Sequence, residues 1–161
     1  MAERKTITLF IYVPDTKEVI LSRRGKLERH AGVLQATVHG QIEPGEISQI
    51  AMKREFAEEV KGDFSKLSNI VDFGEATVGQ MTKEHTYYHG ATLPTPFVEE
   101  LQPTQEVAEL IFVSEADVKQ MTPYSKVREQ EGFDFAASMV MFDDEIEVLK
   151  KIFKQYAKLS N

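Results

Sequence analysis

The stretch GQIEPGEISQIAMKREFAEEVKG, Gly40–Gly62, places glutamates at fixed intervals around one arginine. If residues 47–60 form a helix, at about 100° per residue, then Glu55, Glu58 and Glu59 share one face. Three carboxylates this close together repel one another unless a cation lies among them. Hard oxygen ligands of this kind suit Mg²⁺ or Mn²⁺, and they argue against a zinc site built from nitrogen and sulfur. The stretch therefore predicts a magnesium or manganese site.

Acidic helix faces are common on protein surfaces, and this chain has 26 acidic residues, so clustered glutamates alone would favour a solvated surface. The spacing favours a site, because it matches the Nudix pattern G-x5-E-x7-R-E-U-x-E-E-x-G-U, where U is an apolar residue. The matching residues are Gly40, Glu46, Arg54, Glu55, Glu58 and Glu59. The chain therefore resembles a Nudix hydrolase.

Two positions depart from the family pattern. Lys61 stands where the family has Gly, and we expect Gly62 to end the helix one residue later in the left-handed conformation. His39 stands where many members have a second Gly before Gly40. We expect its side chain to intrude on the cleft and to affect substrate choice.

The resemblance implies a set of metal ligands and a general base. The ligands would be Glu55, Glu58 and Glu59, with Glu46 and a backbone carbonyl at His39 or Gly40 in support. One of the helix glutamates, such as Glu55 or Glu58, or an acid further along the chain, would deprotonate the attacking water. The choice among these bases is left open.

Three further residues gain a role from the resemblance, each beside a simpler interpretation. Arg54 would orient a catalytic glutamate, whereas a surface ion pair with Glu58 would contribute only a few tenths of a kcal/mol. Glu106 is the candidate for an additional catalytic acid, with Glu109 in reserve, although solvated strand-edge acids are about as common. Arg24 ends a predicted strand in a basic loop and would contact substrate phosphate; a solvated turn is the alternative.

Length and composition predict one cytoplasmic domain. The 161 residues, 42% of them hydrophobic, suffice for a single core, so residues 1–161 are expected to form one domain. The lack of cysteine excludes disulfides and thiolate sites and suits a reducing cytoplasm. The apolar run at the N-terminus is too short to span a bilayer, which predicts no membrane association. A net charge of −7 disfavours duplex nucleic acid as a partner, and a homodimer is left open.

Apolar patterns place the strands and helices. Strands are predicted at Thr6–Val13, Glu18–Arg24, Ala36–Val38, Ile70–Gly79, His85–Leu93 and Glu106–Val113. Helices are predicted at Ile47–Val60, from a Ser114 cap, and from Asp143 or Asp144 onward. These elements predict an α/β fold with a mixed sheet between the acidic helix and the C-terminal helix. The resemblance supplies the α/β/α sandwich.

Some side chains are expected in particular surroundings. In the acidic helix, Ile50, Phe56 and Val60 should form an apolar stripe that faces away from the glutamates. In the C-terminal helix, the packed stripe should contain Ile146, Leu149, Ile152 or Phe153, and Tyr156. Residues 40–45 and 94–103 should be loops, the second with Phe97 exposed. Phe133, Phe135, Met139 and Met141 should serve packing.

The resemblance implies a hydrolase that uses Mg²⁺ or Mn²⁺ to cleave a diphosphate joined to another group, such as a nucleoside diphosphate derivative. An isopentenyl-diphosphate isomerase is a weaker alternative, since those enzymes use a cysteine and this chain has none. A catalytically silent Nudix-like binding module is the other alternative, but such modules usually lose motif glutamates. Tyr87, Tyr88 or Phe97 would be the aromatic residues to stack on a base, although core packing is the better expectation for each.

Overall fold

The computed structural model describes residues 4–79 and 83–159. The strands are β1 (Arg4–Val13), β2 (Glu18–Arg24), β3 (Leu34–Gln35), β4 (Val38–Gln41), β5 (Ser68–Val78), β6 (Glu84–Thr92), β7 (Val107–Val113), β8 (Thr122–Pro123) and β9 (Val140–Met141). The helices are α1 (Ser48–Val60), α2 (Thr95–Val98), α3 (Glu115–Val118), α4 (Tyr124–Val127) and α5 (Asp143–Tyr156), with 3-10 turns at Phe64–Lys66 and Phe135–Ala137. No helix in these two ranges is long and apolar enough to cross a membrane. Residues 1–3, which precede the predicted N-terminal strand, lie outside the described part.

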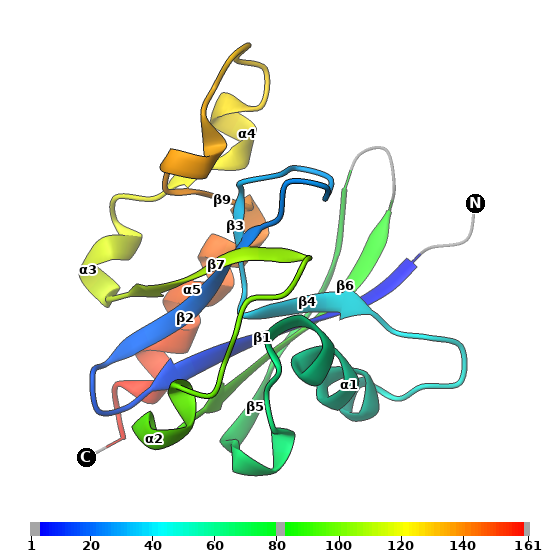
Figure 1. Cartoon of the computed structure of the whole chain (residues 1–161), viewed down its shortest axis with the longest axis vertical. Helices are drawn as coiled ribbons and strands as arrows, with labels where there is room; N and C mark the ends of the chain where they lie inside the picture. Colours follow the sequence, from blue (N-terminus) through cyan, green and yellow to red (C-terminus); the bar gives the residue numbers. More distant parts are fainter. Residues whose placement is uncertain (1–3, 80–82, 160–161) are drawn as a thin grey trace.

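Two helices cover opposite faces of one mixed sheet (Figure 1). On one face α1 packs its Phe56 with Leu9 of β1, and on the other α5 packs its Leu149 with Phe10 of the same strand. In the described part of the chain the sheet has nine strands. The pairs β1 with β6, β3 with β9 and β8 with β9 are parallel, and the others are antiparallel. The predicted α/β/α sandwich with a mixed sheet is confirmed.

The sheet forks along one edge of β1. The other edge of β1 pairs with β6, whereas this edge pairs with β4 at Thr6–Leu9 and then with β2 at Ile11–Val13. The buried Thr37 hydroxyl lies at the fork, where it accepts the N–H of Ile11 at 2.9 Å and donates to the carbonyl of Ile20. These two hydrogen bonds satisfy the backbone groups that the change of partner would leave unpaired. The Thr37 side chain therefore stabilises the fork in the sheet.

The fork also explains one wrong prediction. Ala36–Val38 is not one continuous strand: β4 begins at Val38, and Ala36 and Thr37 separate it from β3 where the Thr37 hydroxyl bridges β1 and β2. Gly40 belongs to β4, where it pairs with Ile7, and not to the predicted loop. The other predicted strands are confirmed, with ends shifted by at most two residues.

The predicted apolar stripe of α1 is wrong in its orientation. Phe56 and Val60 are buried as expected, but Ile50 is 51% exposed. The buried side of the helix contains Glu55 and Glu59, at 8% and 2% exposure. The acids therefore do not face away from the packed surface. Two of them enter the molecule beside the apolar residues.

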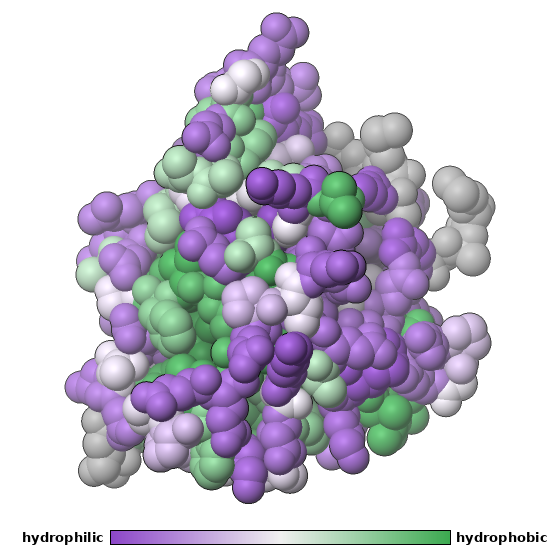
Figure 2. Space-filling model, in the orientation of Figure 1, coloured by the Kyte–Doolittle hydropathy of each residue, from purple (hydrophilic) through white to green (hydrophobic). Residues whose placement is uncertain are grey.

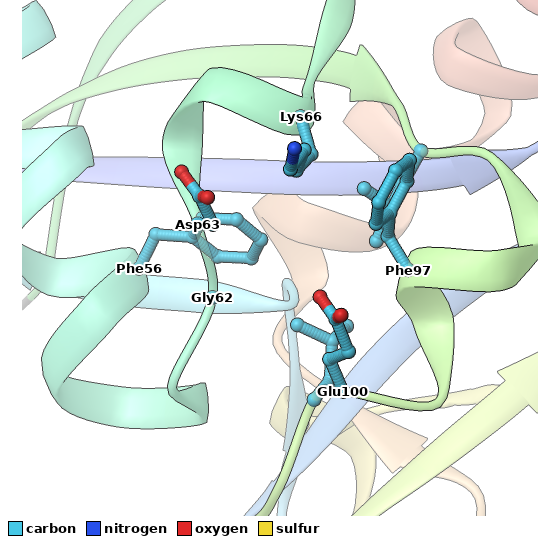
Figure 3. A pocket seen from close by; sticks show the side chains of 8 residues that line it. Phe56, Gly62, Asp63, Lys66, Phe97 and Glu100 are labelled. Carbon is cyan, nitrogen blue, oxygen red and sulfur yellow. The ribbon is translucent and has the colours of Figure 1, made fainter.

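The end of α1 also differs from the prediction. Lys61, and not Gly62, adopts the left-handed conformation, with φ of 58°. Gly62 is required for space, because a Cβ there would lie 2.3 Å from Cζ of the buried Phe56 ring. Figure 3 shows this ring beside the Gly62 backbone. Gly62 therefore makes room for core packing, and its N–H donates to the Phe56 carbonyl at the helix end, but the left-handed residue is Lys61.

Phe97 is not the exposed loop residue that the sequence predicts. It lies in α2, is partly buried against the α1 side of the core, and has the Lys66 ammonium 4.9 Å from its ring centroid. The hollow between these residues and Phe56 has a volume of only about 10 Å³ (Figure 3). A space of this size holds no more than a water molecule. Phe97 therefore has a packing role.

The remaining packing predictions are confirmed. Ser114 caps α3, in a capping box with Asp117. The buried stripe of α5 contains Ile146, Leu149, Ile152, Phe153 and Tyr156. Met141 is buried, and Phe133, Phe135 and Met139 are partly buried against the core. On the surface, Figure 2 shows apolar side chains over β2 and β7, where Phe112 is 43% exposed.

A buried arginine ties the C-terminal third of the chain to the sheet. Arg23 of β2 is 6% exposed. Its Nη1 lies 2.8 to 3.0 Å from the carbonyl oxygens of Gly32, Phe135 and Ser138, and its Nε donates to Glu109 at 2.7 Å. Glu109, the reserve candidate for a catalytic acid, therefore has a structural partner.

We predict that Arg23→Met lowers the free energy of unfolding by about 2–4 kcal/mol, since it removes the Arg23 donor from the carbonyls of Gly32 and Ser138 and leaves Glu109 without its partner. Urea unfolding measures this change. Lys150→Met is the control, because Lys150 forms an exposed ion pair with Glu147, and its replacement should cost less than about 1 kcal/mol. Equal losses in the two variants would contradict the structural role of Arg23.

Candidate metal site

Three carboxylates meet beside the fork. One oxygen from each of Glu55, Glu59 and Glu106 lies within 4.8 Å of the other two. The first two residues come from α1, and Glu106 directly precedes β7. Glu55 and Glu59 are buried, whereas Glu106 is exposed, so the cluster is closed on the helix side and open on the side of Glu106.

Strand β4 shapes the buried side of the cluster. A Cβ at Gly40 would lie 2.2 Å from Cδ of Glu55, so any larger residue would displace this carboxylate. The next residue back, His39, donates its backbone N–H to Oε1 of Glu59 at 3.1 Å. The position of Glu55 thus depends on the missing side chain at Gly40. A metal bond from the Gly40 carbonyl stays a prediction.

The segment that contains Glu106 is attached to α1 and to β2. The Thr104 hydroxyl donates to the carbonyl of Glu59 at 2.7 Å, and the N–H of Gln102 donates to the carbonyl of Val60 at 2.9 Å. From the other side, the N–H of Gly25 donates to the carbonyl of Glu106 at 3.0 Å. No local sequence pattern marks Gly25 or Thr104 as part of the site, because their partners lie far away along the chain.

The cluster is electrostatically costly without a cation. Burial raises the pKa of Glu59 to about 8, and the N–H of His39 only partly offsets this effect. Burial also raises the pKa of Glu55, against the opposing influence of Arg54. Oxygen donors from three carboxylates, with one side open for water or phosphate, suit Mg²⁺ or Mn²⁺. The donor set therefore fits the predicted ion.

Arg54 contacts more than the one glutamate of a surface ion pair. Its Nε and Nη2 donate to the two carboxylate oxygens of Glu46 at 2.8 and 2.9 Å, and its Nη1 donates to Glu55 at 2.7 Å and Glu58 at 3.3 Å. Nη2 also donates to the Gln41 carbonyl at 2.9 Å. Hydrogen bonds from Arg54 lower the pKa of Glu46 to about 2. The arginine is placed to orient the Glu55 carboxylate.

Two predicted ligands lie outside the cluster. Both oxygens of Glu46 are bonded to Arg54. The Glu58 side chain is 59% exposed and contacts Arg54 at the rim. One helical residue turns by about 100°, so Glu58 points outward when Glu59 points inward. Sequence spacing alone could not decide which of the two acids is buried.

The sequence predicts that the His39 side chain intrudes on the cleft, but in the structure this side chain points away from the carboxylate cluster. Gly40 faces α1, so the alternation of the strand directs the His39 side chain toward α5. Its imidazole lies 3.8 Å from Glu84 of β6 and 3.6 Å from Glu145 of α5. Burial alone would lower the pKa of His39, but these two carboxylates raise it to about 10. His39 thus links β4 with β6 and α5, and substrate contact by its side chain stays a prediction.

Arg24 shapes the loop between β2 and β3. Its Nε donates to the Arg29 carbonyl at 2.5 Å and its Nη1 to Gln35 at 2.8 Å, and the guanidinium lies 6.0 Å from the ring centroid of Phe142. Contact with substrate phosphate stays a prediction. The aromatic candidates Tyr87 and Tyr88 serve packing: Tyr88 is 3% exposed and Tyr87 packs on the α1 side of the core.

A larger hollow of about 990 Å³ lies between α3 and α5 and contains none of the predicted site residues. Its floor is formed by Val118, Met121, Ile146 and Phe153. Three lysines and three acids lie around it, so its charge favours no class of ligand.

Comparison with known proteins identifies the class. A model of the NUDIX domain family matches residues 2–131. The chain therefore belongs to the Nudix domain family, a family of pyrophosphohydrolases. The search of curated proteins found no match.

Solved structures share the fold at low sequence identity. The E. coli dihydroneopterin triphosphate pyrophosphohydrolase is 22% identical, covering 83% of this chain and 97% of that chain, with a TM-score of 0.58. A C. elegans Ap4A hydrolase binary complex is 15% identical, covering 96% and 95%, with a TM-score of 0.63. The NUDIX domain of Shewanella oneidensis NrtR, complexed with ADP ribose, is 15% identical, covering 98% and 90%, with a TM-score of 0.67.

The burial of Glu59 predicts a pH dependence of stability without metal. Because its pKa rises from 4.5 to about 8 on folding, the folded protein keeps a proton that the unfolded chain loses between these values. The contribution of Glu59 to stability is therefore greatest below pH 4.5 and falls as the pH rises to about 8. His39 acts in the same direction between pH 6.5 and about 10.

Urea unfolding in EDTA at several pH values tests this dependence. The free energy of unfolding should fall between about pH 6 and pH 8, and the fall should be shallower in Glu59→Gln, which has no proton to lose. Equal slopes in the two proteins would show that Glu59 does not titrate as described.

Proposed function

We propose that this protein hydrolyses a diphosphate bond in a nucleoside diphosphate derivative or a similar linked diphosphate, with Mg²⁺ or Mn²⁺ held by Glu55, Glu59 and Glu106. The observation that carries the proposal is the meeting of these carboxylates within 4.8 Å, two of them buried. Burial of carboxylates is costly. Arg54 offsets part of this cost for Glu55, and a divalent cation would remove more of it for the whole cluster. The proposed substrate is a small molecule. The proposed location is the cytoplasm, because a chain without cysteine suits a reducing compartment.

A bound divalent cation neutralises phosphate oxygens and makes an attacking water more acidic. The protein supplies the remaining parts of the reaction. Arg54 holds the Glu55 carboxylate through its 2.7 Å hydrogen bond and is itself anchored by Glu46. The water proton goes to Glu55, Glu106, or the exposed Glu58 at the rim, and these three remain the proposed bases. Arg24 is the proposed phosphate contact.

The names of the three related structures guide the choice of substrates to test. They mention dihydroneopterin triphosphate, Ap4A and ADP ribose, each of which contains linked phosphates. A panel of these compounds and nucleoside diphosphate derivatives, with Mg²⁺, with Mn²⁺ and with EDTA, covers the class. We expect release of phosphate, pyrophosphate or a nucleoside monophosphate from at least one compound, and only with metal.

Variants of the cluster test the proposed ligands. Glu59→Gln and Glu106→Gln should each reduce turnover by about 100-fold or more, since transition-state stabilisation by metal is worth several kcal/mol. Glu147→Gln, an exposed acid on α5, is the control and should leave turnover unchanged. Turnover without metal, near-normal turnover in both site variants, or substrate binding with no turnover would each reject the proposal.

Arg54 tests the link between geometry and rate. We predict that Arg54→Ala reduces turnover about 100-fold, because a misplacement of about 1 Å at a reacting centre has this effect. Arg54→Lys should be nearly as slow, since lysine cannot reproduce the paired hydrogen bonds to Glu46. Lys53→Ala, on the exposed side of α1, is the matched control. Turnover within about threefold of wild type in Arg54→Ala, far from that 100-fold loss, would leave Arg54 as a surface ion pair.

A further inference from the structure

Gly25 lies directly after β2 in the loop that leads to β3. Gly25 does not have a positive φ, so its backbone conformation does not require glycine. Space does. A Cβ at Gly25 would lie 2.6 Å from the carbonyl oxygen of Gln105 and 3.2 Å from that of Glu106.

Neither of these oxygens can rotate away, because both belong to the backbone. An added methyl group therefore has to separate the two chain segments. The separation would also strain the 3.0 Å hydrogen bond from the N–H of Gly25 to the carbonyl of Glu106. Gly25 thus permits the close approach that holds the Glu106 backbone against β2.

The other end of the same segment is attached to α1. Thr104 donates to the carbonyl of Glu59, which belongs to the same helix as the Glu55 carboxylate. If the Glu106 backbone moves away from Gly25 while Thr104 stays bonded to α1, the Glu106 carboxylate changes its position relative to Glu55 and Glu59. The distances between the Glu106 carboxylate and those of Glu55 and Glu59 therefore depend on the size of residue 25.

We propose that Gly25 is a positioning residue that sets the metal affinity of the cluster by holding Glu106 in place. This inference rests on the proposed function, since it takes Glu106 to be a metal ligand. Gly25 itself contributes no side chain to the site and acts only through the backbone of Gln105 and Glu106. Residues that orient metal ligands typically change the affinity by about 10–100-fold when replaced.

A double-mutant cycle on Mn²⁺ binding tests the proposal. Mn²⁺ affinity is measured by electron paramagnetic resonance in wild type, Gly25→Ala, Glu106→Gln and the double variant. We expect Gly25→Ala to weaken binding by about tenfold or more in the wild-type background and to have no further effect once Glu106 is replaced. Leu27→Ala is the matched control, because Leu27 belongs to the same loop and is 95% exposed.

A second readout needs no metal. In EDTA, hydrogen exchange of the amide at position 25 and of residues 104–107 should be faster in Gly25→Ala than in Leu27→Ala, while the melting temperatures stay close. An unfolded Gly25→Ala protein, unchanged Mn²⁺ affinity, or an equal loss of affinity with and without Glu106 would each overturn the inference. By contrast, wild-type affinity in Glu106→Gln would overturn the proposed ligand set itself.

Discussion

Two carboxylates, those of Glu55 and Glu59, are buried on the side of α1 that packs against the sheet, and much of the site structure offsets the cost of that burial. Arg54 donates to the first, and the N–H of His39 donates to the second. Burial still raises the pKa of both carboxyl groups, so these partners do not cancel the desolvation. A divalent cation between these residues and Glu106, as proposed, would complete the compensation.

The fork in the sheet provides the place for this cluster. Along one edge, β1 pairs first with β4 and then with β2. The hydroxyl of Thr37 satisfies the backbone at the fork. β4 then supplies Gly40 and the N–H of His39, while the chain before β7 supplies Glu106. Fold and site thus depend on the same irregularity.

The sequence predicted the parts of this structure that local patterns encode. Periodicity located α1, α5 and most strands, and motif spacing pointed to Glu55 and Glu59. Helical geometry alone could not show that Glu58 points to solvent, because the burial of one face depends on where the sheet lies. Contacts between distant segments, such as Gly25 with Glu106, leave no local pattern. The direction of the His39 side chain likewise depended on the register of β4 with β1.

The most direct measurement is the location of a bound ion by anomalous diffraction from crystals grown with Mn²⁺. The structure predicts an anomalous peak among Glu55, Glu59 and Glu106, with one carboxylate oxygen of each within about 2.0–2.3 Å. The Arg54 guanidinium should remain bonded to Glu46 and Glu55. A peak at the rim between Glu46 and Glu58 with none in the cluster, or no peak at saturating Mn²⁺, would contradict a metal site built on the two buried carboxylates.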